Sequence, residues 1–233
     1  MGLKVWAEDF LGLLFPNVCE VCGRTLVHGE RLLCLHCIAD MPRTGIHGDG
    51  FTDIHKRLAG RTPIHRAAAY FHYYRDNPYA RMIQAAKYNS RPRLARELAR
   101  MFAAEIAGSG FFDGIDMILP VPLHSFKELR RGYNQSREIA RGLSDITGIE
   151  IGENLEARRG HSTQTRRNAY ERWINTEDIY CVAAPHELDS KHLLLVDDVI
   201  TTGATMLRCA EAIHAAAPGA VISVAALGFT HGI

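Results

Sequence analysis

Two adjacent acids and a run of hydroxyl-bearing residues occur together in the last fifth of the chain. Asp197 and Asp198 follow the apolar run 193–196, and the turn 201–205 carries three threonines and a glycine. This order predicts a buried strand, a turn and the start of a helix. The unpaired N–H groups of a helix start can bind phosphate, whereas paired carboxylates suit sugar hydroxyls or a magnesium ion. The stretch therefore predicts a site for a sugar phosphate.

This stretch, from His192 to Thr205, resembles the signature of the type I phosphoribosyltransferases, which bind phosphoribosyl pyrophosphate (PRPP). The resemblance implies that the turn binds the 5-phosphate, that the acid pair binds the ribose hydroxyls and acts in catalysis, and that magnesium accompanies the diphosphate. The residues implied in PRPP binding here are Asp197, Asp198, Thr201, Thr202, Gly203, Ala204 and Thr205. The alternative is an ordinary buried strand followed by a threonine-capped helix. Neither G-x-G-x-x-G nor G-x-x-x-x-G-K-[ST] occurs, so dinucleotide and P-loop sites lack their residues.

A second loop follows the apolar segment 115–121, which we predict to be another buried strand. Loops at the carboxyl ends of parallel strands share one edge of the sheet, so this loop should face the acid pair. The resemblance implies that it is the pyrophosphate loop. Its predicted PRPP-binding residues are Leu123, His124, Arg130 and Arg131. The two guanidinium groups suit bidentate contacts with phosphate, and a helix is expected from residue 133 to 143.

Residues 157–170 form a long polar and basic stretch without clear periodicity. Loops of this length are either functional lids or disordered segments. The resemblance implies a mobile hood that closes over PRPP, with Arg158, Arg166 and Arg167 as its candidate contacts. The alternative is a merely flexible basic loop.

Four cysteines near the N-terminus occur as two C-x-x-C pairs. Cys19 and Cys22 are separated by eleven residues from Cys34 and Cys37. This spacing is typical of a tetrahedral site for structural zinc, although redox motifs or disulfides are alternatives. So short a segment buries too little apolar surface to fold alone, and zinc would supply the missing stability. The remaining cysteines, at positions 181 and 209, are isolated and predicted to be core residues.

Two helices are predicted around a basic stretch, one beginning at Asn77-Pro78 and one after Pro92. From residue 81 to residue 100 there are six basic residues and one acid. If they face outward, Lys87, Arg93 and Arg96 are candidate contacts for DNA phosphates. The alternative is an ordinary solvated helix face.

The chain of 233 residues, with 47% hydrophobic residues, can build one substantial domain and a small appendage. We expect an N-terminal helix with a zinc-ribbon module over 1–45, a linker or hood segment over 46–75, and a phosphoribosyltransferase-like domain over 76–233. The expected fold class is α/β, a parallel sheet flanked by helices. No apolar run is long enough to span a bilayer, and the first residues lack the pattern of a signal peptide, so a cytoplasmic location is expected.

Taken together, the C-x-x-C pairs, R-R-G-Y-N-Q, H-S-T-Q-T-R-R-N and V-D-D-V-I-T-T-G-A-T resemble the ComF family of competence-associated, phosphoribosyltransferase-like proteins. The resemblance implies a role in natural transformation, with single-stranded DNA and competence proteins as partners. Two hypotheses remain open. The chain is either an enzyme that transfers a phosphoribosyl group from PRPP with magnesium, or an inactive PRPP- or nucleotide-sensing module that handles DNA.

Overall fold

The structure, a computed structural model, describes residues 17–48, 50–59, 62–74, 77–88, 91–123, 132–157 and 180–230. The predicted helix near residues 3–15 lies outside these ranges. So do most of the two predicted loops, including the site residues His124, Arg130, Arg131, Arg158, Arg166 and Arg167. Their roles remain predictions.

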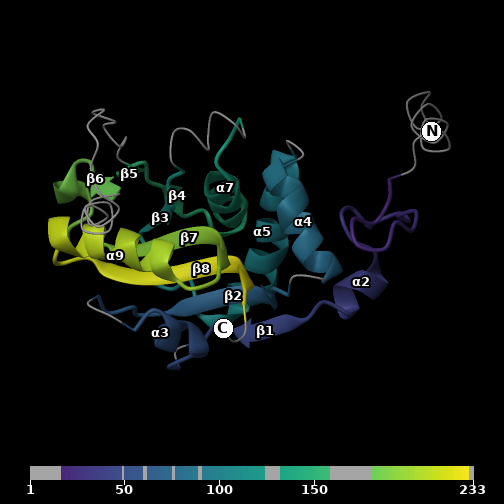
Figure 1. The fold of residues 1–233 in the computed structure, drawn as a ribbon, viewed down its shortest axis with the longest axis horizontal. Coiled ribbons are helices and arrows are strands. Elements are labelled where there is room, and N and C mark those ends of the chain that lie inside the picture. The colour runs from purple at the N-terminus through teal and green to yellow at the C-terminus, as the bar shows by residue number, and fades with distance from the viewer. Residues whose placement is uncertain are drawn as a thin grey trace, which may run out of the picture.

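A six-stranded sheet, β1-β2-β8-β7-β3-β4, runs through the middle of the molecule (Figure 1). All neighbouring strands are parallel except β1 and β2, which are antiparallel. The strands of this sheet are β1 (Arg43–Ile46), β2 (Ala67–His72), β3 (Met117–Pro120), β4 (Glu150–Ile151), β7 (His192–Ile200) and β8 (Val221–Phe229). A separate antiparallel pair, β5 (Leu155–Ala157) and β6 (Tyr180–Val182), brings together the two ends of the predicted hood stretch.

Helices cover both faces of the sheet, which explains why its central strands are apolar on both sides. The helices are α2 (Leu35–Ala39), α3 (Asp53–Arg57), α4 (Pro78–Tyr88), α5 (Pro92–Ile106), α7 (Gln135–Thr147) and α9 (Ala204–Ala216), with short 3-10 turns at Ala107–Ser109 and Pro185–Glu187. Alternate residues of β7 belong to two separate cores. Leu194 and Val196 pack with α4, α5 and α7, whereas Leu193 and Leu195 pack with α3 and α9. This arrangement confirms the predicted fold class.

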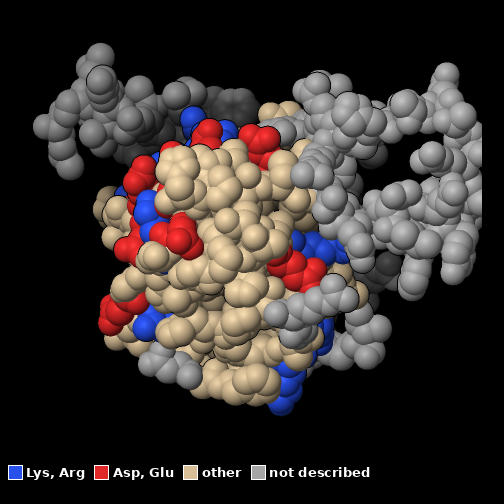
Figure 2. All heavy atoms as spheres, turned by 90° about the vertical axis from the view of Figure 1, so that its left-hand side faces the viewer, with Lys and Arg blue, Asp and Glu red and all other residues tan. Residues whose placement is uncertain are grey.

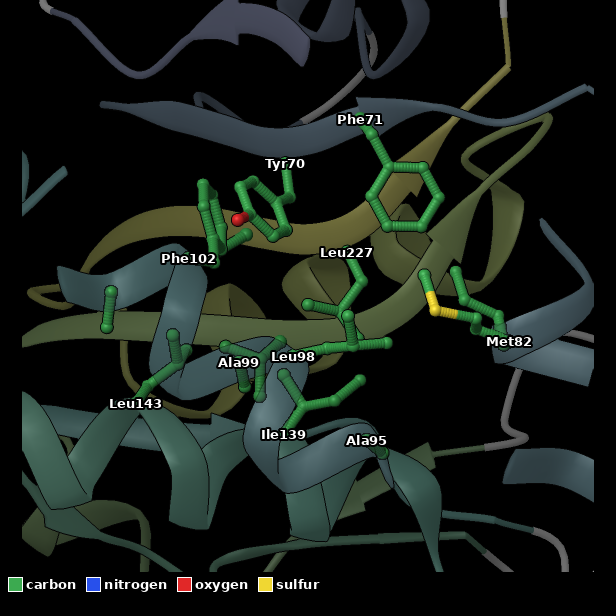
Figure 3. Packing of buried hydrophobic residues seen from close by; sticks show 14 of the residues in the cluster. Tyr70, Phe71, Met82, Ala95, Leu98, Ala99, Phe102, Ile139, Leu143 and Leu227 are labelled. Carbon is green, nitrogen blue, oxygen red and sulfur yellow. The ribbon is translucent and has the colours of Figure 1, made fainter. Parts of the chain in front are cut away.

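The larger core lies between the sheet and the helices α4, α5 and α7 (Figure 3). The rings of Tyr70 and Phe102 stack there with centroids 5.0 Å apart, and Leu98 and Ile139 fill the space between α5 and α7. These two helices approach closely at Gly142, where an added Cβ would lie 2.3 Å from the carbonyl oxygen of Arg96. The close contact fixes the start of α7 relative to the sheet.

The helix start predicted at Asn77-Pro78 is confirmed by its cap, whereas the helix predicted from residue 133 begins at Gln135. The side chain of Asn77 accepts a hydrogen bond of 2.9 Å from the N–H of Tyr79 at the start of α4. Asn134 caps α7 in the same way, accepting 3.0 Å from the N–H of Ser136. Both caps satisfy N–H groups that the first turn of a helix leaves unpaired.

Residues 46–75, predicted as a linker or hood, contribute a strand to the main sheet. The loose alternation from Arg66 to Tyr74 predicts a strand, which the structure shows as β2. β2 pairs in parallel with β8, and β1 extends the sheet beyond it. The helix α3 was not predicted, because this segment contains many glycines. It is a short helix that packs against the same core as Leu193 and Leu195 of β7. The sheet therefore begins before residue 76, while the division of the chain into domains remains a prediction. None of the described helices combines the length and the apolar character needed to cross a membrane.

Candidate functional site: a cysteine cluster and an acid pair at the sheet edge

The four N-terminal cysteines come together. The sulfur atoms of Cys19, Cys22, Cys34 and Cys37 all lie within 4.8 Å of one another. The distance between the sulfurs of Cys22 and Cys34 is 3.8 Å, which matches the edge of roughly 3.8 Å that a tetrahedron with Zn–S bonds of about 2.3 Å requires. Neither Cys181 nor Cys209 belongs to this cluster. The four thiols can therefore hold one metal ion such as zinc.

Main-chain N–H groups donate hydrogen bonds to sulfur atoms of this cluster. Burial opposes ionisation of Cys19, but backbone N–H groups of Cys22, Cys34 and Val21 lower its pKa to about 6. The N–H of Cys34 donates to the Cys19 sulfur at 3.4 Å, and that of Cys37 donates to the Cys34 sulfur at 3.5 Å. Such N–H···S contacts stabilise thiolates, which are the form that binds a metal.

Three contacts attach the cysteine module to the rest of the chain. The hydroxyl of Tyr79 in α4 donates to the carbonyl of Cys37 at 2.6 Å. Arg91 forms a bidentate ion pair with Glu20. Arg43 donates to the carbonyl of Ile38 at 2.7 Å. The module is therefore fixed mainly against the start of α4 and against the residue that precedes α5.

The acid pair lies near the carboxyl end of β7, as predicted. Asp197 accepts hydrogen bonds from the Ser136 hydroxyl at 2.9 Å and from the N–H of Asp198 at 2.8 Å. Burial raises the pKa of Asp197 to about 7, and the charge of Asp198 acts in the same direction. Asp197 is thus placed by the first turn of α7, and near neutral pH it changes between its protonated and ionised forms.

Asp198 has a cationic partner that the sequence did not reveal. Its carboxylate lies 2.8 Å from the ammonium group of Lys87 at the end of α4. The two side chains are 14% and 22% exposed, so neither is sealed from solvent. Lys87, one of the predicted candidate contacts for DNA, therefore points toward the acid pair.

The hydroxyl turn forms the other half of the site. Thr201, Thr202, Ala204 and Thr205 are exposed at the start of α9 and line a hollow that is open to solvent. The N–H of Ala204 has only a long contact of 3.4 Å with the Thr202 hydroxyl. N–H groups and hydroxyls at the start of this thirteen-residue helix can bind one phosphate group.

The backbone conformation and the close packing at position 203 both require a glycine. Its φ angle is +78°, in the left-handed region that side chains disfavour. An added Cβ would also lie 2.6 Å from a methyl carbon of Leu58. The glycine therefore lets the turn pack against the end of α3.

Arg57 of α3 holds the same turn, and sequence reasoning did not identify it. Its guanidinium donates to the carbonyl of Thr201 and, at 3.1 Å, to the hydroxyl of Thr230. It also lies over the ring of Phe229, 4.9 Å from the centroid. These contacts join the hydroxyl turn to the end of β8.

Two residues of the motif R-G-Y-N-Q, Tyr133 and Asn134, form hydrogen bonds with the end of α4 and the end of β3. The hydroxyl of Tyr133 donates to the carbonyl of Ala86 in the last turn of α4. The side-chain amide of Asn134 donates to the carbonyl of Val121 at the end of β3, at 3.0 Å. Leu123 is the one predicted loop residue inside the described ranges, and it is partly buried just beyond β3.

Four of the six basic residues between 81 and 100 are paired with carboxylates. Lys87 pairs with Asp198, Arg91 pairs with Glu20, and Arg96 and Arg100 both contact Asp145. Arg96 does so through two hydrogen bonds of 2.7 Å, and its role in DNA contact remains a prediction. Arg93 is exposed, as predicted. On the side of the molecule shown in Figure 2, the described Lys and Arg side chains lie toward the margins and are interleaved with acids.

A mostly parallel sheet with helices on both faces, a hydroxyl-rich turn between a strand and a helix, and an acid pair near the end of that strand are typical of the phosphoribosyltransferase class. Residues 84–231 match the model of the phosphoribosyl transferase domain, and the chain belongs to this family.

Among characterised relatives, the DNA utilization protein YhgH of Escherichia coli (strain K12) is 27% identical over 199 residues, covering 84% of this chain and 83% of that protein. Competence protein F of Haemophilus influenzae is 32% identical over 134 residues, covering 55% and 58%. These similarities confirm the predicted resemblance to the ComF family. Among solved structures, glutamine PRPP amidotransferase from B. subtilis, complexed with ADP and GMP, matches with a TM-score of 0.38 and 20% identity. That match covers 56% of this chain and 25% of the enzyme.

Proposed function

We propose that this protein binds PRPP with Mg²⁺ at the carboxyl edge of its sheet and acts in the cytoplasm on single-stranded DNA taken up during natural transformation. The observation that carries the PRPP proposal is the continuity of Asp197, Asp198 and the hydroxyl turn at the end of one strand. This arrangement supports a ligand with sugar hydroxyls at one end and a phosphate at the other. The DNA-related part rests on the names of the relatives, Competence protein F and DNA utilization protein YhgH.

In this proposal the hydroxyl turn, Thr201–Thr205, holds the 5-phosphate through its N–H groups and hydroxyls. Asp197 and Asp198 accept hydrogen bonds from the ribose hydroxyls. Because Lys87 already pairs with Asp198, and because Asp197 is protonated over part of the neutral range, the acid pair is a poor site for a bare cation. Magnesium would therefore arrive with the diphosphate and stabilise its negative charge.

If the protein is an enzyme, the bond between C1′ and the diphosphate oxygen breaks and its electron pair leaves with the diphosphate. A nucleophilic atom of the acceptor then forms the new bond to C1′ and releases its proton to water. The residues would contribute mainly by positioning the ribose and by electrostatic stabilisation. The predicted contacts from Arg130 and Arg131 to the diphosphate belong to this proposal.

Calorimetric titration with PRPP in the presence and absence of Mg²⁺ tests the binding proposal. We expect saturable binding of one PRPP per chain that weakens strongly without Mg²⁺. An assay for pyrophosphate release with nucleobases and single-stranded DNA then separates the two hypotheses. Release that depends on an acceptor supports the enzyme, whereas tight binding without release supports the sensing module. Absence of PRPP binding would refute both.

Contact with single-stranded DNA is proposed for Lys87, Arg93 and Arg96, and Arg93 is the most direct test because its side chain is exposed. Each phosphate neutralised by a basic residue makes binding more dependent on salt. The Arg93→Ala variant should therefore show a smaller salt slope than the parent protein. An unchanged slope would remove this residue from the DNA-binding surface.

A further inference from the structure

The structure points to a further ligand contact on α4. We propose that Lys87 determines specificity by binding the 1-diphosphate of the ligand, so that the site distinguishes PRPP from ribose 5-phosphate. This inference rests on the proposed function, because it names which part of PRPP an additional residue recognises.

The position of Lys87 relative to the hydroxyl turn supports this assignment. Alternation along β7 sends Asp198 toward the face covered by α4, α5 and α7, whereas the hydroxyl turn leads into α9 on the opposite face. Lys87 reaches Asp198 from α4, with 2.8 Å between the ammonium nitrogen and the carboxylate oxygen. The cation therefore lies on the other side of the acid pair from the proposed 5-phosphate site.

The chemistry of the ligand also supports a contact from Lys87. In PRPP the diphosphate is attached to C1′, which is bonded to C2′, one of the two carbons that carry the ribose hydroxyls. If Asp198 binds these hydroxyls, a cation that touches Asp198 is adjacent to the carbon that carries the diphosphate. An ammonium group has three N–H donors, so Lys87 can keep its contact with the carboxylate and offer another donor to a phosphate oxygen.

The end of α4 also lies beside Tyr133, a residue that follows the predicted diphosphate loop in the sequence. Tyr133, two residues after that loop, donates a hydrogen bond to the carbonyl of Ala86. Lys87 is the next residue along α4. The partial exposure of Lys87 and Asp198 leaves both groups accessible to a ligand. An ion pair that served only stability would not need this location.

The test compares the affinities of the full chain for PRPP and for ribose 5-phosphate, both with Mg²⁺, by calorimetry. Lys87→Met should weaken PRPP binding by about ten- to a hundredfold, the expected loss for a charged hydrogen bond. Binding of ribose 5-phosphate should change by less than about threefold, because that ligand lacks the diphosphate. Lys87→Arg, which keeps the cation, should retain most of the preference for PRPP.

Lys191→Met is the matched control, since Lys191 precedes β7 at the opposite edge of the sheet. Thermal unfolding checks that each variant folds, and Lys87→Gln replaces the Met variant if that variant is unstable. Equal losses for both ligands would show that Lys87 only organises Asp198, and unchanged PRPP affinity would show that it does not contact the ligand. Either result overturns the inference while leaving PRPP binding by the parent protein intact. A parent protein that binds neither ligand would refute the proposed function itself.

Discussion

The hydroxyl of Tyr79 donates a 2.6 Å hydrogen bond to the main-chain carbonyl of Cys37, one of the four clustered cysteines. Tyr79 is in the first turn of α4, and the last turn of the same helix carries Lys87 to Asp198. One helix therefore contacts both the cysteine cluster and the acid pair.

Tyr79→Phe should destabilise the protein by about 1–3 kcal/mol, because it leaves a buried carbonyl without its hydrogen bond. Urea unfolding monitored by circular dichroism measures this change. Tyr74→Phe is a suitable control, since Tyr74 is exposed. Equal stabilities of the Tyr79→Phe variant and the parent protein would show that this bond does not hold the cysteine module to α4.

The purified protein should contain about one zinc ion per chain, bound by Cys19, Cys22, Cys34 and Cys37. The double variant Cys34→Ser/Cys37→Ser should lose the metal, because two thiolates cannot fill a tetrahedral shell. Cys181→Ser and Cys209→Ser should keep it. Metal analysis by mass spectrometry gives the stoichiometry, and full zinc content in the double variant would refute the assignment.

The stability of the protein should fall as the pH rises from about 4 to about 7, owing to Asp197. Burial, assisted by Asp198, raises the pKa of this carboxyl from 3.8 to about 7 in the folded state. The folded protein therefore binds this proton more tightly than the unfolded chain, and deprotonation costs stability. Asp197→Asn removes the titration, so its stability relative to the parent protein should increase across this range.

Asp145 is the control for this pH dependence. Its hydrogen bonds with Arg96 lower its pKa, so its contribution is present at neutral pH and is lost only as the pH falls below the ordinary range of an aspartate. The profile of Asp145→Asn should therefore run parallel to that of the parent protein between pH 5 and 7. Parallel profiles for Asp197→Asn as well would contradict the raised pKa.

Arg57→Met should weaken the binding of both PRPP and ribose 5-phosphate by about tenfold, because Arg57 holds the Thr201 carbonyl and thereby orders the phosphate cradle. This equal loss would contrast with the selective loss expected for Lys87. The neighbouring Lys56→Met, which removes an exposed ion pair with Asp53, should have little effect. Unchanged affinity in Arg57→Met would mean that the turn is ordered without this clamp.

Local patterns in the sequence were sufficient to predict the parts of the fold that depend on neighbouring residues. The apolar run before Asp197, the cap at Asn77 and the cysteine spacing all act over short stretches of chain. The strand at Ala67–His72 was predicted, but its place in the main sheet was not, because its partner β8 is distant in the sequence.

The partners of the site residues could not be predicted, because they are distant in the sequence. Arg57 and Thr201 are 144 residues apart, and nothing in the pattern around Arg57 indicates a phosphate cradle. Lys87 read as one basic residue among six on a helix. Only the packing of α4 against the sheet shows that this lysine faces Asp198 and that its neighbours Arg91 and Arg96 are neutralised by other acids.

We propose that Asp197 and Asp198 hold the ribose of PRPP. The PRPP affinity of the double variant Asp197→Asn/Asp198→Asn, measured at pH 8 with Mg²⁺, tests this most directly. We expect its affinity to fall at least about tenfold per lost charged contact, with the fold intact by circular dichroism. Glu211→Gln, which neutralises an acid two turns into α9, should bind as the parent protein does. PRPP binding by the double variant with unchanged affinity would contradict the account.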